Sequence, residues 1–153
     1  MSAPAPDAVL IRHASAVVFG ADDTHPGFGV MIEGPSGSGK SALALQLIAL
    51  GATLVADDRT RVQARDGWPW LHAPERLAGV IEARGVGLLR VPVRPRAPLR
   101  LIVDMGAVET DRLPDPATRD VLGQYIRCIR RVDGPHFAGS IVALATGDWW
   151  HDG

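Results

Sequence analysis

The residues most able to do chemistry stand at 34–41, which read GPSGSGKS. Gly34, Gly39, Lys40 and Ser41 complete the pattern G-x-x-x-x-G-K-[ST], a loop whose backbone N–H groups surround nucleotide phosphates. Lys40 is the one lysine among sixteen basic residues, and its compact ammonium on a flexible stem can reach between the β- and γ-phosphates. The hydroxyl of Ser41 would contact Mg²⁺. This stretch predicts a binding site for ATP and Mg²⁺.

A Gly/Ser-rich turn that merely caps a helix would give similar letters. A strand expected over 30–33 and a helix expected over 40–50 supply the flanks that a phosphate loop requires, and they favour nucleotide binding. The residues predicted to bind the nucleotide are Gly34, Pro35, Ser36, Gly37, Ser38, Gly39, Lys40 and Ser41.

A second carboxylate at a strand end should hold Mg²⁺ or its waters, and two segments could supply it. TLVADD (53–58) ends in Asp57 and Asp58, whereas LIVD ends in Asp104. The doubled acids favour the first segment, because adjacent strand residues point to opposite sides. One acid could then serve the metal while its neighbour accepts a hydroxyl proton from a second substrate. For Asp104 we favour the alternative of a solvated strand end.

A further group of residues lies in VIEARGVGLL (80–89), with Glu82, Arg84, Gly85 and Gly87. A surface turn with an ion pair is the structural alternative. Together, however, GPSGSGKSALALQLIALGATLVADDR and IEARGVGLLRV closely resemble the catalytic domain of bacterial HPr kinase/phosphorylase. The resemblance is dense over 28–91 and thinner over 99–145.

The resemblance implies a role for each matching residue. Lys40 and its loop would bind the β- and γ-phosphates of ATP, and Mg²⁺ would be held by Ser41 and Glu82. Asp58 would accept the proton of a serine on the phosphocarrier protein HPr, with Asp57 toward the metal, or the two acids would have these roles reversed. Such an enzyme regulates the phosphotransferase system and carbon metabolism, and the family pattern implies a homo-hexamer.

Two more residues take roles from the resemblance. His13 would stand near the acidic pair and tune it, or be a partly buried strand residue. Arg112, in ETDRLPD, would stabilise the transferring phosphoryl group, or be a surface arginine in a loop. The family's larger members carry an N-terminal domain that this chain does not show before His13, so the chain resembles a short form.

Two further departures concern loops. The segment 20–29 is longer than its family equivalent. The Arg-rich segment that the family links to phosphorolysis is replaced near DGPHFAGS (133–140), which predicts a kinase with weak phosphate-dependent dephosphorylation.

Composition limits the remaining possibilities. The 153 residues carry a formal net charge of −1, which gives no electrostatic footprint for nucleic acid or an anionic membrane. The longest apolar stretch, 42–56, is too short to span a bilayer, and no targeting segment is evident, so we expect a cytoplasmic protein without membrane insertion. The absence of asparagine excludes the guanine-reading motif of Ras-type GTPases and the catalytic loop of eukaryote-like protein kinases.

The elements that must position these residues alternate along the chain. We expect a disordered N-terminus over 1–8 and a single P-loop kinase domain over 9–153, of the α/β class. It would be similar to the HPr kinase catalytic domain and to the nucleotide site of phosphoenolpyruvate carboxykinases. Other expected elements are strands at 14–20, 53–58 and 99–105, a strand and turn at 60–70, a short helix, Gly-rich loop and strand within 73–91, a loop at 91–98, a short helix then a strand within 116–130, and a strand or last helix at 139–145.

Two rival functions use the same loop. A small-molecule kinase would need an Arg-rich lid, for which 90–100 is the candidate. A nucleotide-sensing module would bind ATP without turnover. The acids Asp57, Asp58 and Glu82 argue against the sensing module, because a binding-only module needs no proton acceptor.

Overall fold

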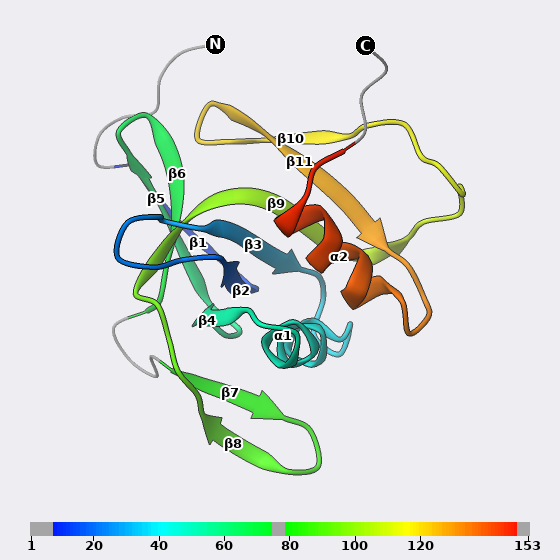
Figure 1. Ribbon diagram of the computed structural model, residues 1–153, viewed down its shortest axis with the longest axis horizontal. Helices are drawn as coiled ribbons and strands as arrows, with labels where there is room; N and C mark the ends of the chain where they lie inside the picture. Colours follow the sequence, from blue (N-terminus) through cyan, green and yellow to red (C-terminus); the bar gives the residue numbers. More distant parts are fainter. Residues whose placement is uncertain (1–7, 75–78, 150–153) are drawn as a thin grey trace.

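A bent sheet with two helices on one face forms the body of the molecule, seen in a computed structural model that describes residues 8–74 and 79–149 (Figure 1). Within these residues no helix is long and apolar enough to cross a membrane. The elements are β1 (Val9–Arg12), β2 (Ala14–Phe19), β3 (Phe28–Glu33), α1 (Lys40–Ala49), β4 (Thr53–Ala56), β5 (Thr60–Arg65), β6 (Trp68–His72), β7 (Val80–Ala83), β8 (Gly87–Arg90), β9 (Arg96–Val108), β10 (Thr118–Val121), β11 (Gln124–Arg131) and α2 (Phe137–Thr146).

The sheet is organised around the long strand β9. The start of β9 pairs antiparallel with β6, and its middle pairs parallel with β3. β11 pairs parallel with β9 as well, on the side of β9 opposite to β3. The resulting order is β1-β5-β6-β9-β3-β2-β4, with the β10–β11 hairpin attached through β11. Because β3 and β9 are parallel neighbours, Glu33, the last residue of β3, lies beside Asp104 of β9 at one edge of the sheet. The phosphate loop begins at this edge.

Strand alternation produces two apolar cores, one on each face of the sheet. Val30 and Ile32 of β3 pack on the helix side, whereas Met31 between them packs on the opposite side. Ile102 of β9 shares the face of Met31, and its neighbours Leu101 and Val103 share the helix face. Residues buried on both faces explain why these strands read as continuous apolar runs in the sequence.

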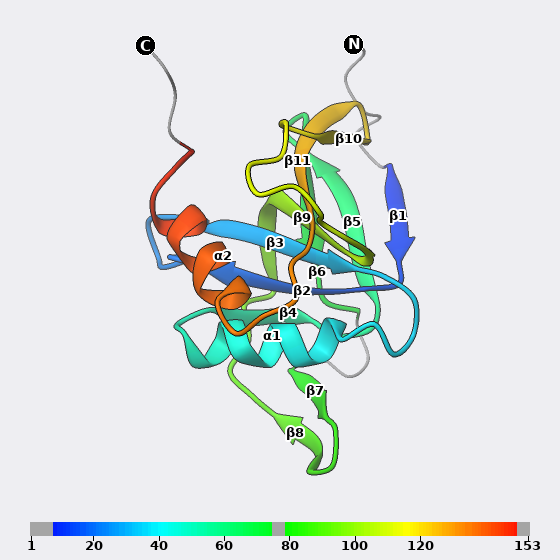
Figure 2. The ribbon, with the colours of Figure 1, turned by 90° about the vertical axis from the view of Figure 1, so that its right-hand side faces the viewer.

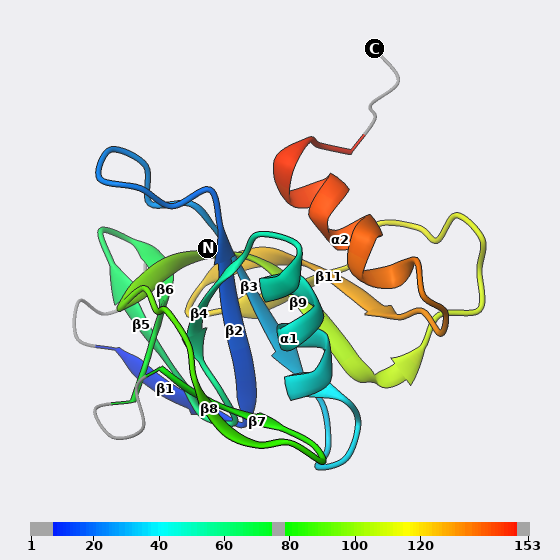
Figure 3. The same ribbon diagram turned by 60° about the horizontal axis from the view of Figure 1, so that its bottom comes forward.

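The two helices lie together on one face of the sheet, and the β7–β8 hairpin extends beneath α1 (Figures 2 and 3). Helix α1 buries Leu43, Ala44 and Leu47 against the sheet. The exposed Ala42 and Gln46 lie on its other side, so α1 is buried along one face only. The hairpin contacts α1 through β7, and Glu82 and Ala83 of β7 line the same pocket as Lys40 and Ser41, where the phosphate loop ends and the helix begins.

Two expected short helices are wrong, because both segments form β-hairpins. Residues 80–90 are β7 and β8 joined by a tight turn in which Gly85 has φ 82°, a left-handed conformation that interrupts a helix. Residues 118–131 are β10 and β11 joined by Leu122 and Gly123, both with positive φ, as in a two-residue hairpin turn. Part of the first expected helix, residues 75–78, lies outside the described residues.

Other expectations agree more closely. Helix α1 ends at Ala49, one residue before the expected end, and the undecided segment 139–145 falls within α2. Strand β4 ends at Ala56, so Asp57 and Asp58 lie just beyond the strand and not within it. The disordered terminus predicted over 1–8 lies outside the described residues except for Ala8, whose carbonyl accepts a hydrogen bond from Ala64 N–H.

Candidate active site

The phosphate loop occupies the turn from β3 to α1. A side chain at Gly34 would come within 2.6 Å of Ser38 Oγ, and Gly39, the residue before the helix, has φ 97°, so both positions favour glycine. Helix α1 begins without a side-chain cap and without an acid in its first turn. Its free N–H groups and helix dipole are therefore directed at the loop, an arrangement that favours a bound anion.

Two polar groups inside the loop also fit a phosphate ligand. Lys40 is only 7% exposed, and its ammonium donates to the carbonyls of Gly34 at 2.8 Å and Pro35 at 3.1 Å. The hydroxyl of Ser38 is buried and has no hydrogen-bond partner among residues 8–74 and 79–149. A buried polar group without a partner is costly, and phosphate oxygens would supply the missing acceptors.

Asp57 connects three separate segments of the site. One carboxylate oxygen accepts hydrogen bonds from Ser15 Oγ and Ser41 Oγ, each at 2.7 Å, and the other accepts the backbone N–H of Glu82 at 3.1 Å. These contacts tie β2, the start of α1 and β7 to one carboxylate. Ser41 and Glu82, the predicted Mg²⁺ ligands, are thus held near each other by Asp57.

Asp58 has a different environment from its neighbour. Its carboxylate lies 2.7 Å from His13 Nε2, and the side chains of Asp58 and His13 are 71% and 52% exposed. Asp58 also has φ 67°, a left-handed conformation that aspartate tolerates better than most residues. The two adjacent acids therefore point to different partners, with Asp57 directed into the protein and Asp58 toward solvent.

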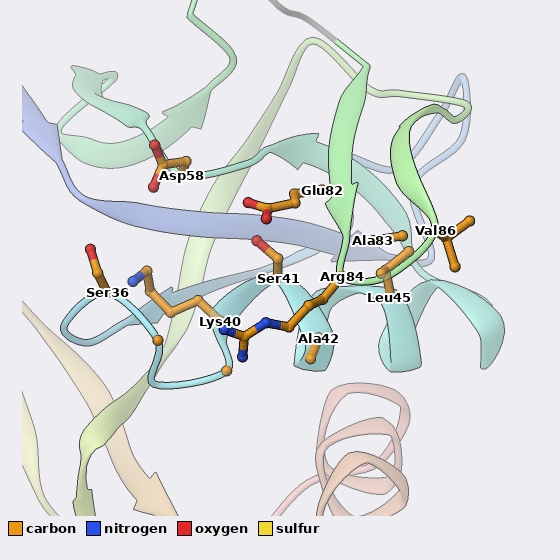
Figure 4. Close-up of a pocket in the computed structure, with 12 residues that line it drawn as sticks. Ser36, Lys40, Ser41, Ala42, Leu45, Asp58, Glu82, Ala83, Arg84 and Val86 are labelled. Atoms are coloured by element: carbon orange, nitrogen blue, oxygen red, sulfur yellow. The ribbon is translucent and has the colours of Figure 1, made fainter.

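Gly39, Lys40, Ser41, Asp58 and Glu82 line a single pocket of about 520 Å³ (Figure 4), whereas the other groups described above, His13, Ser15, Gly34, Pro35, Ser38 and Asp57, lie outside its lining. It runs from Asp58 past the phosphate loop and Glu82 to the turn of the β7–β8 hairpin. The described residues contain no group of three or more His, Cys, Asp or Glu arranged to hold a metal by themselves. Mg²⁺ commonly takes only one or two protein carboxylates and completes its shell with phosphates and water, so this donor set fits it.

The chain is similar to known proteins over most of its length. The family described as HPr Serine kinase C-terminal domain matches residues 18–126, which is more than half of the chain. The chain belongs to this family. It is 40% identical over 119 residues to an HPr kinase/phosphorylase of Polaromonas naphthalenivorans, covering 66% of this chain and 36% of the relative. An HPr kinase/phosphorylase of Bordetella pertussis is also 40% identical, over 114 residues, covering 66% of this chain and 37% of the relative.

The fold agrees with a solved structure of the same kind. The Hpr(Ser) kinase/phosphatase from Coxiella burnetii superposes with a TM-score of 0.69 at 23% identity, covering 87% of this chain and 85% of that one. The predicted α/β P-loop fold of the HPr kinase catalytic domain is therefore confirmed. The chain spans about a third of the length of the curated relatives it matches, and His13 lies before the residues that the family matches.

Arg112 does not lie in the pocket of this HPr kinase domain. It lines a second hollow of about 550 Å³, between the β9–β10 loop, β11 and α2. In the phosphate pocket the arginine is Arg84, whose side chain extends from the β7–β8 turn toward the phosphate loop (Figure 4). The structure thus brings together every predicted site residue except Arg112.

Asp104, the rejected alternative for the metal carboxylate, is engaged elsewhere. It accepts the backbone N–H of Gly106 at 2.8 Å and lies 3.7 Å from Arg119. Arg119 also pairs with Glu33, the last residue of β3, which Arg12 contacts at 2.8 Å from the other side. This charge cluster supports the strand ends beneath the phosphate loop and does not line the pocket.

Sequence reasoning missed two residues of the site. Ser15 is fully buried within a strand of otherwise apolar residues, and a buried hydroxyl must find a partner, which here is Asp57. A single serine within an apolar strand could therefore have indicated a buried polar contact from the sequence alone. Arg84 stands inside the Glu-x-Arg-Gly-x-Gly segment, and its place in the motif pointed to it directly.

Proposed function

We propose that the protein is an ATP- and Mg²⁺-dependent kinase that phosphorylates a serine on the phosphocarrier protein HPr. The observation that carries the proposal is the exposed Asp58–His13 pair at the open end of a pocket that also contains the phosphate loop. A carboxylate in that position can reach a hydroxyl presented by a protein surface. The names of the relatives support HPr as that protein.

The donor phosphates would lie in the loop. Lys40 would leave the loop carbonyls it now contacts and bind the β- and γ-phosphates, while the N-terminal N–H groups of α1 bind the phosphate oxygens. Ser41 and Glu82 would hold Mg²⁺, with Asp57 orienting the hydroxyl of Ser41 and positioning the backbone of Glu82. Held there, Mg²⁺ would supply positive charge that offsets the negative charge of the phosphates during transfer.

Asp58 would act as the proton acceptor. Among the described residues its one side-chain hydrogen-bond partner is His13, which contacts a single carboxylate oxygen, so the other oxygen would accept the serine proton as the hydroxyl attacks the γ-phosphorus atom. Asp57 already accepts three hydrogen bonds, which leaves it poorly placed for this role. The contacts of the two acids thus support the original assignment over the reverse.

Two arginines are candidates for stabilising the transferring phosphoryl group. Arg84 lines the phosphate pocket, whereas Arg112 would have to come from the loop beside the second hollow. We assign the contact to Arg84 within one subunit. A contribution from Arg112 would require its loop to reach a site in another copy of the chain, consistent with the proposed homo-hexamer.

The reverse reaction, in which the phosphoryl group of phosphoserine passes to inorganic phosphate and leaves pyrophosphate and a free serine hydroxyl, should be weak. It brings two anions together, and each close pair of like charges costs about 4 kcal/mol at an intermediate dielectric unless cations neutralise it. The segment 133–140 offers only His136. Of the two nearby arginines that could supply a cation, Arg131 is engaged by Asp133 at 3.0 Å and by the carbonyl of Met105, whereas Arg130 lines the second hollow with His136.

The rival of a small-molecule kinase finds less support. Arg94, in its candidate lid, donates to the carbonyl of Ala21, and residues 90–100 do not line the phosphate pocket. Incubation of the protein with ATP, Mg²⁺ and purified HPr, followed by intact-mass measurement of HPr, tests the proposal. We expect HPr to gain one phosphoryl group on serine. We also propose that the kinase itself is a cytoplasmic protein. ATP turnover without HPr phosphorylation would contradict the HPr assignment.

A further inference from the structure

The phosphate pocket has two chemically different ends. One end is polar and contains Lys40, Ser41, Asp58 and Glu82. The other end is formed by aliphatic side chains, with only the Arg84 guanidinium between them and the loop (Figure 4). These aliphatic residues are Ala42, Leu45, Ala83 and Val86.

The direction of the phosphoryl donor follows from this polarity. If Asp58 accepts the proton of the acceptor serine, as the proposed function requires, the γ-phosphate must lie at the Asp58 end of the pocket. The loop and the start of α1 hold the phosphate chain in the middle of the pocket. The remainder of the donor must then extend to the aliphatic end, away from the acceptor.

We propose that the nucleoside part of the donor binds at this aliphatic end, between the first turns of α1 and the turn of the β7–β8 hairpin. Ala42 and Leu45 are three residues apart and share one face of α1. Val86 lies across from them on the hairpin turn and is 76% exposed, so its apolar surface is available to cover a base. Apolar walls around a flat ring with polar groups at one end are typical of small-ligand pockets.

The hairpin turn holds Val86 in a defined position. Its N–H donates to the carbonyl of Ala83 at 2.9 Å, and Gly85 takes the left-handed conformation that the turn requires. Arg84, in the same turn, extends toward the loop, where its guanidinium can contact the phosphates nearest the nucleoside (Figure 4). One short turn thus provides a cation for the phosphates and an apolar cover for the base.

Comparing a donor with and without a nucleoside tests this inference. Binding of Mg²⁺-ATP and of Mg²⁺-tripolyphosphate would be measured by calorimetry for the wild type and for Val86→Gln, a neutral change that leaves local charge unaltered. We expect Val86→Gln to weaken ATP binding by about five- to tenfold, because apolar contact with the base is lost. Tripolyphosphate binding should stay within about twofold. The matched control is Leu88→Gln, on the same hairpin, 73% exposed and outside this pocket, which should alter neither ligand.

Several outcomes would overturn the inference. ATP binding unchanged by Val86→Gln, or both ligands weakened equally, would place the nucleoside elsewhere. An unchanged ATP affinity combined with a raised KM for the protein acceptor would assign the hairpin to the acceptor instead. Failure of the proposed function gives a different result, since neither ligand would then bind the wild type more tightly than a Lys40→Ala variant.

Discussion

Replacing Asp57 by alanine should destabilise the fold far more than the same change at Asp58. The Asp57 carboxylate accepts hydrogen bonds from Ser15 and Ser41 at 2.7 Å and from the backbone N–H of Glu82 at 3.1 Å. A hydrogen bond to a charged group contributes about 1.5–3 kcal/mol, and a buried hydroxyl left without a partner costs about 1–3 kcal/mol. Ser15 is fully buried, whereas Ser41 and Glu82 can turn to water. We therefore expect Asp57→Ala to lower the free energy of unfolding by about 3 kcal/mol.

Asp58→Ala is the matched control for this experiment. The Asp58 side chain is 71% exposed and, within the part of the chain that the structure describes, its hydrogen-bond partner is the exposed His13, so its loss should cost less than about 1 kcal/mol. Urea unfolding followed by tryptophan fluorescence measures both variants. The reasoning would be refuted if Asp57→Ala stayed within about 1 kcal/mol of the wild type, or if Asp58→Ala were equally destabilising. A Ser15→Ala background should reduce the effect of Asp57→Ala, because the stranded hydroxyl is then absent.

Three further predictions concern activity and pH. Lys40→Arg should nearly abolish phosphoryl transfer, because a planar guanidinium cannot replace an ammonium only 7% exposed, and turnover within a few-fold of the wild type would contradict this. Phosphoserine-HPr with millimolar phosphate and no ATP should release pyrophosphate much more slowly than the kinase reaction runs, and comparable rates would contradict weak phosphorolysis. Burial, followed by the charges of neighbouring arginines, lowers the pKa of His72 from its ordinary value of 6.5. The unfolded chain therefore binds a proton more readily than the folded one, so the free energy of unfolding should fall as the pH drops below about 6.5. In His72→Gln the loss of unfolding free energy between pH 7.5 and pH 5 should be smaller, and an equal loss would exclude His72 as a cause.

The sequence predicted the strand–loop–helix unit best, because its signals are local. The glycines and Lys40 specify the loop, and the helix formers after Ser41 specify α1. The β7–β8 and β10–β11 hairpins were missed, since their strands are four to eight residues long and depend on pairing. Leu122 in a left-handed turn was a weak signal, because such turns usually contain glycine or asparagine. The pairing of β9 with three strands distant in sequence could not be read from periodicity alone.

In the site, too, features with a local sequence signal were predicted, and features that depend on distant segments meeting were not. The adjacency of Asp57 and Asp58 predicted that the acids would serve different partners, although they lie beyond β4 and diverge because Asp58 is left-handed. The three contacts of Asp57 depend on β2, α1 and β7 meeting at one point, which no local pattern specifies. Arg112 was assigned from similarity of a short loop, and the fold leads that loop to the second hollow.

The most direct test of the central claim separates binding from transfer at Asp58. Mg²⁺-ATP affinity and the rate of serine phosphorylation on HPr, the latter from intact and fragment masses, would be measured for the wild type and for Asp58→Asn. An amide cannot accept the serine proton and barely alters the phosphate loop, so we predict ATP affinity within a few-fold of the wild type and transfer reduced by about a hundredfold or more. Transfer by Asp58→Asn close to the wild-type rate, or its loss in Asp57→Asn alone with full ATP binding, would contradict the proposed role of Asp58.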